Sequence, residues 1–282
     1  MRCVAVAEAW SAGGFGGAVV WGRVDISFVA RRLTQLGIGL GKSEPGWDPP
    51  SLLLVDTYDP IERARLATIQ GPRGRILVDD AGEPVPAGYD GVWLPSGAGY
   101  GGLYPEFPGT VFTGLESVAL RGDLPAWNPA PPLRVGVLLG GGALPGDVPA
   151  ALARLAAKMH PVQFATADAS LHPGWVPLNA NDPWVELAKC DRLLAGAGSI
   201  MWEAASVGIP VVLLLTAENQ QRNFQWGRSS GVPCVVAVGK GAGELCQALL
   251  EAIPRATPLP RILNGAGRLA TGFVELVRRT RE

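Results

Sequence analysis

The chain alternates short, uninterrupted apolar runs with longer segments whose apolar residues recur at helical spacing. The run 51–55 precedes a helical pattern over 61–69, and the run 211–215 precedes another over 221–230. Uninterrupted runs of this length are typical of strands buried on both faces, as in parallel sheets. Strands that alternate with helices in this way predict an α/β fold with parallel sheets.

A proline-rich segment, 125–132, separates two such series of strands and helices. The chain has 282 residues, which exceeds the usual size of one domain, so each half is long enough to bury its own core. We therefore predict two domains, 1–127 and 128–282.

The stretch 195–203 joins an apolar run at 191–194 to a helical pattern through two glycines. It predicts a buried strand, a tight turn and a helix that begins near Ser199. Glycine lets a backbone turn sharply and approach a ligand closely, and the first turn of a helix attracts anions. The backbone of Gly198, Ser199 and Ile200 is therefore a candidate phosphate site. The alternative is an ordinary strand-to-helix turn in which Ser199 serves as the N-cap.

Polar residues follow this candidate turn in two places. Glu203 comes one helical turn later, where its carboxylate could reach the hydroxyls of a ribose. Glu218, Asn219 and Gln220 follow the apolar run 211–215, at the carboxyl end of a predicted buried strand. Open α/β sheets bind ligands at such ends, and side-chain amides both donate to and accept from sugar hydroxyls.

Candidate catalytic residues in the first half also follow predicted strands. Asp56 and Tyr58 come after the run 51–55, where a carboxylate and a phenol could hold a sugar hydroxyl or orient a water. The alternative for Asp56 is to cap the helix over 61–69. Asp79 and Asp80 are adjacent, so they point in different directions and do not form the facing pair of a glycosidase. One is expected to line a cleft while the other caps a turn.

The pattern Gly198-Ser199-x-x-Trp202-Glu203, followed by Gly208-x-Pro210 and Glu218-Asn219-Gln220, resembles a known family. This family is the nucleotide-sugar hydrolase of pseudaminic acid biosynthesis, which acts on UDP-2,4-diacetamido-2,4,6-trideoxy-β-L-altropyranose and is related to MurG-type GT-B glycosyltransferases. The resemblance covers nearly the whole chain, with further blocks at 55–58, 77–80, 114–124, 140–141 and 264–268.

The resemblance implies a GT-B-like α/β fold of two Rossmann-like domains with a cleft between them. Domain 1–127 would lie on the sugar or acceptor side, and domain 128–282 would bind UDP. The implied reaction is hydrolysis of a UDP-linked amino-deoxy sugar to UDP and free sugar, without a cofactor or metal. The implied substrate-binding residues are Gly141, Asp80, Gly198, Ser199, Ile200, Glu203, Glu218, Asn219 and Gln220, and the implied catalytic residues are Asp56 and Tyr58.

The first residues, 1–9, resemble the helix that follows the family's Gly-x-Gly-His loop. The first domain is then expected to lack its first strand and the histidine proposed as the base, since His160 and His172 both fall in the other half. Three explanations stay open: a start codon placed too far downstream, a natural variant without the base, or another residue in its role. The glycine loop also departs from the family pattern by carrying Ala143 and Leu144.

Two other functions remain open from the sequence: a glycosyltransferase that uses a UDP-sugar donor, and a non-catalytic sugar-nucleotide binding protein. With 24 basic and 25 acidic residues, nothing points to a nucleic-acid partner. The longest apolar runs are far shorter than the roughly 20 residues of a membrane helix. The four cysteines form no CxxC pair, so we expect reduced thiols in a cytoplasmic protein without a metal site. The oligomeric state is not predicted.

Overall fold

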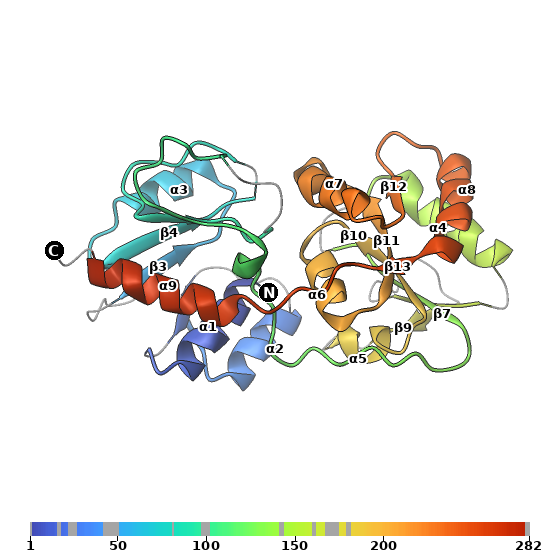
Figure 1. Cartoon of the computed structure of the whole chain (residues 1–282), viewed down its shortest axis with the longest axis horizontal. Coiled ribbons are helices and arrows are strands. Elements are labelled where there is room, and N and C mark those ends of the chain that lie inside the picture. The colour runs from blue at the N-terminus through green and yellow to red at the C-terminus, as the bar shows by residue number, and fades with distance from the viewer. Residues whose placement is uncertain are drawn as a thin grey trace. The chain divides into compact units, whose positions relative to one another are not determined.

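Two compact units make up the chain (Figure 1). The computed structural model describes residues 2–15, 18–21, 27–41, 51–80, 82–96, 102–140, 144–159, 162–166, 175–178 and 182–279. Unit 1 comprises Met1–Gly122 with Leu263–Glu282, and unit 2 comprises Asp123–Ile262. This division differs from the expected one, 1–127 and 128–282, because the segment Leu263–Glu282 belongs to unit 1.

Parallel strands form the core of unit 1. Four of them make one sheet, in the order β3 (Leu52–Val55), β4 (Gly74–Val78), β5 (Gly91–Trp93) and β6 (Thr110–Phe112). A separate parallel pair consists of β1 (Val19–Trp21) and β2 (Gly39–Gly41). The apolar runs of the sequence therefore become strands, at nearly the predicted positions.

Helices cover both faces of this four-stranded sheet. Ile76 of β4 packs with α1 (Arg2–Ala12) and α9 (Ala266–Arg279), whereas the next residue, Leu77, packs beneath α3 (Pro60–Ala67). Successive strand residues point to opposite faces, so α1 and α9 share one face and α3 takes the other. Phe273 of α9 lies edge-on to Trp93 and Phe112 of the sheet, which explains why the last helix belongs to unit 1.

The amino-terminal segment is a helix, as expected from the resemblance of residues 1–9. Its Val4 joins a small cluster with Leu33 and Ile38, so the start of the chain also contacts the segment that contains α2 (Ser27–Gln35). A 3₁₀ turn, Leu115–Ser117, precedes the end of unit 1's first part.

Unit 2 is built on one larger, mostly parallel sheet. Its path has the order β12-β11-β10-β7-β8-β9, and β13 pairs antiparallel with β11. The strands are β7 (Arg134–Leu138), β8 (Gln163–Thr166), β9 (Val176–Pro177), β10 (Arg192–Gly196), β11 (Pro210–Leu215), β12 (Cys234–Val236) and β13 (Thr257–Pro258). From β7 the chain adds β8 and β9 on one side and β10, β11 and β12 on the other. The order of the strands therefore reverses between β7 and β10.

Helices again cover both faces. On one face α4 and α8 pack over Val212 and Leu214 of β11. On the other, Leu213 of β11 contacts α7 so closely that a Cβ on Gly227 would lie 2.2 Å from its Cδ1 atom. The helices are α4 (Asp147–Lys158), α5 (Pro183–Leu187), α6 (Ser199–Val207), α7 (Gln221–Ser229) and α8 (Ala242–Ala252), followed by a 3₁₀ turn at Ile253–Arg255.

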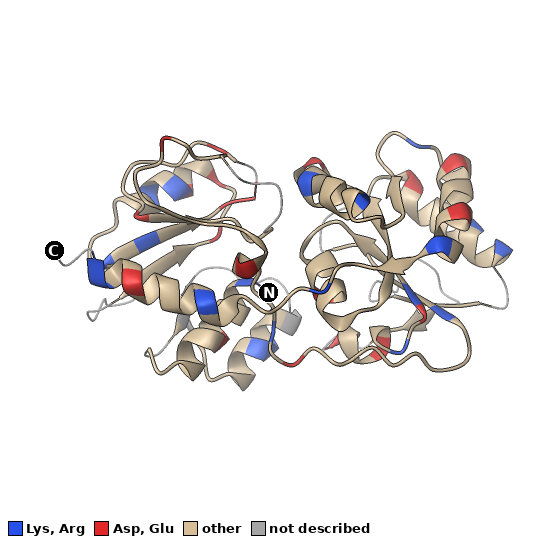
Figure 2. Cartoon of the chain, viewed as in Figure 1, with Lys and Arg blue, Asp and Glu red and all other residues tan. Residues whose placement is uncertain are grey.

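Basic and acidic residues are interspersed along the elements of both units (Figure 2). None of the helices within the described residues is long and apolar enough to cross a bilayer.

Candidate functional site

The reversal of strand order in unit 2 brings two strand ends into close contact. β7 and β10 are parallel neighbours, with Leu138 opposite Ala195. A Cβ on Gly196 would lie 2.4 Å from the carbonyl oxygen of Leu139, so only glycine fits at this position. Open α/β sheets bind ligands in the crevice outside such a switch point, at the carboxyl ends of the strands.

The helix that starts at this point has an open first turn. Gly198 is the N-cap of α6, and no side chain within the described residues caps the helix. Ser199 is the first helical residue, so the alternative in which its hydroxyl serves as the N-cap is wrong. The first N–H groups of a helix have no partner inside the helix, and here they lie beside the switch point. Together they form a candidate site for a phosphate or diphosphate.

Glu203 lies one turn into α6 and is buried. Its Oε2 atom accepts a 2.6 Å hydrogen bond from the indole Nε1 of Trp184, which α5 supplies. Asp182 caps α5 through the backbone N–H of Trp184 and thereby sets the position of this tryptophan. The carboxylate of Glu203 is thus held in one orientation by a neighbouring helix.

The polar residues after β11 form a 3₁₀ turn, Glu218–Gln220. Gln220 Oε1 accepts from both the backbone N and the Oγ1 of Thr216, each at 3.1 Å. Its Nε2 atom lies 4.0 Å from the place that a Cβ on Gly198 would occupy. The structure therefore brings Gln220 beside the open helix start, while Glu218 and Asn219 are exposed. Gly141, His160 and His172 lie outside the described residues.

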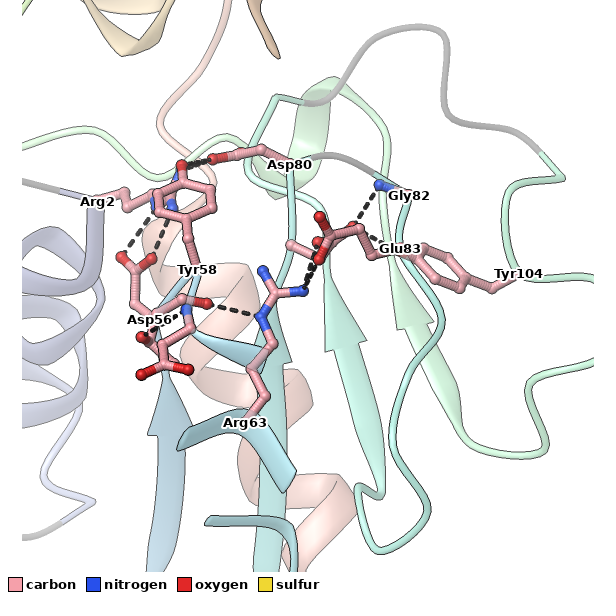
Figure 3. Close-up of polar contacts among 11 residues, drawn as sticks. Arg2, Asp56, Tyr58, Arg63, Asp80, Gly82, Glu83 and Tyr104 are labelled. Atoms are coloured by element: carbon pink, nitrogen blue, oxygen red, sulfur yellow. Dashed lines mark hydrogen bonds and ion pairs between the residues drawn. The ribbon is translucent and has the colours of Figure 1, made fainter. Parts of the chain in front are cut away.

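In unit 1 the predicted residues Asp56, Tyr58 and Asp80 meet at the carboxyl ends of β3 and β4 (Figure 3). Arg2 joins them: its Nε and Nη2 donate to Asp56 at 3.1 and 2.6 Å, and its Nη1 donates to Asp80 Oδ2 at 2.6 Å. Tyr58 Oη donates to the same Asp80 oxygen at 2.6 Å. Sequence reasoning did not single out Arg2, because no local pattern shows that the first turn of α1 reaches two strand ends.

Asp56 does not cap the following helix, so that alternative is wrong. Asp59 is the N-cap of α3, and its Oδ1 accepts from Ile61 N at 2.9 Å and Glu62 N at 3.4 Å. An aspartate directly before a proline is a typical helix start, so the sequence did contain this signal at Asp59 and Pro60. The side chain of Asp56 is left for the contact with Arg2.

Burial and pairing set the protonation of these groups. Partial burial alone would raise the pKa of Asp56, but hydrogen bonds and charge from Arg2 outweigh it and hold the pKa below its ordinary value. Partial burial and the Asp80 carboxylate raise the pKa of Tyr58 to about 12. Near neutral pH Asp56 is therefore a paired carboxylate, and Tyr58 is a neutral phenol that donates a hydrogen bond.

Asp79 is buried and contacts other residues than Asp80 does, as expected for adjacent carboxylates. Its Oδ1 lies 3.3 Å from Nη1 of Arg63, and its Oδ2 accepts from Gly82 N at 2.6 Å and from the hydroxyl of Tyr104. Arg63 Nε also donates to the Thr57 carbonyl at 2.7 Å. The buried Arg63–Asp79 pair thus ties the segment after β3 to the end of β4. Asp79 has a structural role, and Asp80 faces Arg2 and Tyr58.

Neither a protein-family model nor a curated protein matches this chain. Solved structures do match it along its length. MnaA of S. aureus, solved with UDP, aligns with a TM-score of 0.66 and 13% identity over 99% of this chain and 94% of that one. The UDP-GlcNAc 2-epimerase of Neisseria meningitidis, bound to UDP-GlcNAc, aligns with a TM-score of 0.63 and 14% identity over 99% of this chain and 98% of that one.

MurG of Acinetobacter baumannii aligns with a TM-score of 0.53 and 13% identity over 96% of this chain and 95% of that one. The chain has the GT-B fold. The fold class expected from the sequence, α/β with two Rossmann-like units, is therefore confirmed. Identities this low establish the fold and leave the reaction to be argued from the residues.

Proposed function

We propose that this GT-B protein hydrolyses a UDP-linked amino-deoxy sugar to UDP and the free sugar. The observation that carries the proposal is the uncapped start of α6 at the switch point of unit 2, with Gln220 beside it and Glu203 one turn further on. Two proteins of the same fold, named above, were solved with UDP or UDP-GlcNAc. The sequence resemblance described above favours an amino-deoxy sugar.

In the proposed scheme unit 2 holds the nucleotide. Backbone N–H groups around Gly198, Ser199 and Ile200 bind the diphosphate and stabilise the charge that develops on the leaving group. Glu203 accepts from the ribose hydroxyls, while Asn219 and Gln220 offer amides to polar groups of the sugar. Glu218 and Gly141 complete the proposed binding set.

Unit 1 contributes the groups that orient the sugar or the water. Water attacks the anomeric carbon, the bond from this carbon to the diphosphate oxygen breaks, and UDP leaves with the electron pair, while the proton that the water loses passes to solvent. An efficient general base has a pKa near the working pH, whereas the pKa of Asp56 is lowered and that of Tyr58 is raised. We therefore assign Asp56 and Tyr58 the positioning of water or substrate, with Asp80 as a sugar contact.

A glycosyltransferase is the second candidate, because the same donor site serves transfer when an acceptor hydroxyl replaces water. The resemblance to MurG in fold favours this candidate as much as it favours hydrolysis. A sugar-nucleotide binding protein without catalysis is the third. The three functions differ in the release of UDP: hydrolysis releases it in water alone, transfer requires an acceptor, and a binding protein releases none.

The deciding experiment measures UDP release by the purified full chain from a panel of UDP-amino sugars, each with and without candidate acceptors. We expect release in water alone, together with equimolar free sugar. Release that requires an acceptor would assign transfer. UDP binding without release would assign a binding protein, and a rearranged sugar nucleotide with no release would assign isomerisation instead.

A further inference from the structure

Arg2 connects the ends of two neighbouring strands through a single side chain (Figure 3). Its three guanidinium nitrogens all donate to carboxylates: Nε and Nη2 form a two-pronged pair with Asp56, and Nη1 binds Asp80. The thiol of Cys3, the next residue of α1, donates to Asp56 Oδ2 at 3.2 Å. The first turn of α1 thus fixes Asp56 from two sides.

The arrangement depends on the positive charge of Arg2. Asp56 and Asp80 carry like charges that repel one another when nothing lies between them. Tyr58 is 57% exposed, and its hydroxyl donates a hydrogen bond to the Asp80 oxygen that Arg2 also binds. Arg2 and Asp80 have side-chain exposures of only 19% and 10%, so solvent screens this pair less than an ordinary surface ion pair. A shift of Arg2 would therefore move all three partners.

We propose that Arg2 is a positioning residue for the reaction of this site: it holds Asp56 and the Asp80–Tyr58 pair in the geometry that orients the sugar and the water. The inference rests on the proposed function. Arg2 acts through its carboxylate partners, since each of its guanidinium nitrogens already donates to one of them. Its planar fork is what allows one side chain to bind two carboxylates.

Substitution of Arg2 by lysine distinguishes positioning by the guanidinium fork from an effect of the positive charge alone. An ammonium group is a compact point charge, so Arg2→Lys keeps the charge but cannot reproduce the two-pronged pair with Asp56 and the bond to Asp80 together. Arg2→Gln removes both charge and fork. If Arg2 acts by positioning, the three proteins rank as wild type, then Arg2→Lys, then Arg2→Gln.

The test uses the full chain with Arg2→Gln, Arg2→Lys and the control Arg65→Gln, whose arginine pairs with Glu62 on the surface of α3. For each protein we would measure kcat and KM for UDP release, the Kd of UDP and of UDP-GlcNAc by calorimetry, and the melting temperature. We expect Arg2→Gln to lower kcat about tenfold or more, a loss typical of a misplaced reacting group, with the Kd of UDP changed less than about twofold. Arg2→Lys should recover part of kcat, and Arg65→Gln should match the wild type.

A kcat for Arg2→Gln within about twofold of the wild type would overturn the inference, as would an Arg2→Lys variant as fast as the wild type. If Arg2→Gln does not fold, Arg2→Lys decides alone, and wild-type kcat in that variant refutes a positioning role. If the wild type releases no UDP from any sugar nucleotide, the proposed hydrolysis fails.

The role of Arg2 is then tested by binding alone. In that case the wild type should bind UDP-GlcNAc and UDP with different Kd values, and Arg2→Gln should bind both with the same Kd. An unchanged difference, or equal Kd values in the wild type, would overturn the inference.

Discussion

The indole Nε1 of Trp184 donates a 2.6 Å hydrogen bond to Oε2 of Glu203, and both side chains are buried. The bond links α5 to α6 and holds a carboxylate one turn behind the open helix start at Gly198. A buried carboxylate is costly to desolvate, so its orientation must be supported by such donors. Because Glu203 lies next to a candidate phosphate site, its substitution tests directly whether unit 2 binds the nucleotide there.

Glu203→Ala should weaken the binding of UDP. If Glu203 accepts from the ribose hydroxyls, its loss removes hydrogen bonds to a charged group, worth about 1.5–3 kcal/mol, or roughly 10- to 100-fold in Kd. Isothermal titration calorimetry with UDP measures the change. The control is Glu244→Ala, which removes an exposed carboxylate of α8. A Kd equal to that of the wild type would contradict the placement of the ribose at Glu203.

Gly198→Ala should impair nucleotide binding without unfolding the protein. Gly198 has a φ of −102°, which any residue adopts, and among the described residues the nearest atom to an added Cβ is Gln220 Nε2 at 4.0 Å. The free protein therefore accommodates alanine, whereas a phosphate that approaches the backbone would meet the new methyl group. We expect a melting temperature within about 2 °C of the wild type, since a substitution without a clash costs little, and a Kd for UDP raised at least about fivefold.

The matched control for Gly198 is Gly241, the N-cap glycine of α8. It has a φ of −69°, and no atom of the residues that the structure describes lies within 4 Å of an added Cβ. Gly241→Ala should leave both the melting temperature and the Kd of UDP nearly unchanged. Equal effects of the two substitutions on UDP binding would remove α6 from the phosphate site.

Asp56→Asn and Tyr58→Phe should each lower turnover while the affinity for UDP stays nearly constant. Both groups lie in unit 1, and we assign them to the water or sugar, so their loss misplaces reacting atoms and costs roughly 10- to 100-fold in kcat. Steady-state UDP release and calorimetry on the same preparations separate the two quantities. Full turnover in both variants would show that the unit 1 part of the site is wrongly assigned.

Arg63→Met should destabilise unit 1 strongly. Arg63 is only 2% exposed, and Asp79, whose Oδ1 lies 3.3 Å from it, is fully buried. Removing one partner of a buried ion pair leaves the other charge without compensation, which costs about 3–5 kcal/mol in the free energy of unfolding. Urea unfolding followed by circular dichroism measures this loss. Arg65→Met, on the exposed side of α3, should change the free energy of unfolding by less than about 0.5 kcal/mol.

The phenol of Tyr58 should ionise late in a pH titration. Partial burial and the Asp80 carboxylate raise its pKa to about 12, from an ordinary value of about 10. Because the folded pKa lies above the unfolded one, the stability that this group contributes is fully present below pH about 10 and is lost as the pH rises through about 12. The difference in phenolate absorbance between the wild type and Tyr58→Phe should have its midpoint near pH 12. In the Asp80→Asn background this midpoint should move lower, and a midpoint near 10 in the wild type would contradict the contact.

The segments whose pattern is local were predictable from the sequence. Apolar runs such as 51–55 and 211–215 became β3 and β11, since an uninterrupted apolar run is stable only where both of its faces are covered. The glycine turn before α6 was also predictable. The turn requires glycine for a reason that the sequence could not show, because the clash that excludes a side chain at Gly196 comes from Leu139 on another strand.

The composition of the candidate site depended on the tertiary structure. Asp56, Tyr58 and Asp80 were marked by their place after strands, but only packing of α1 against the sheet brings Arg2 between them. The same holds for α9, because its own sequence does not specify which sheet it covers. Contacts of Phe273 with Trp93 and Phe112 place it in unit 1. Short-range periodicity thus determined the elements of this protein. The pairing of charges and helices over long sequence separations was decided by the packed core.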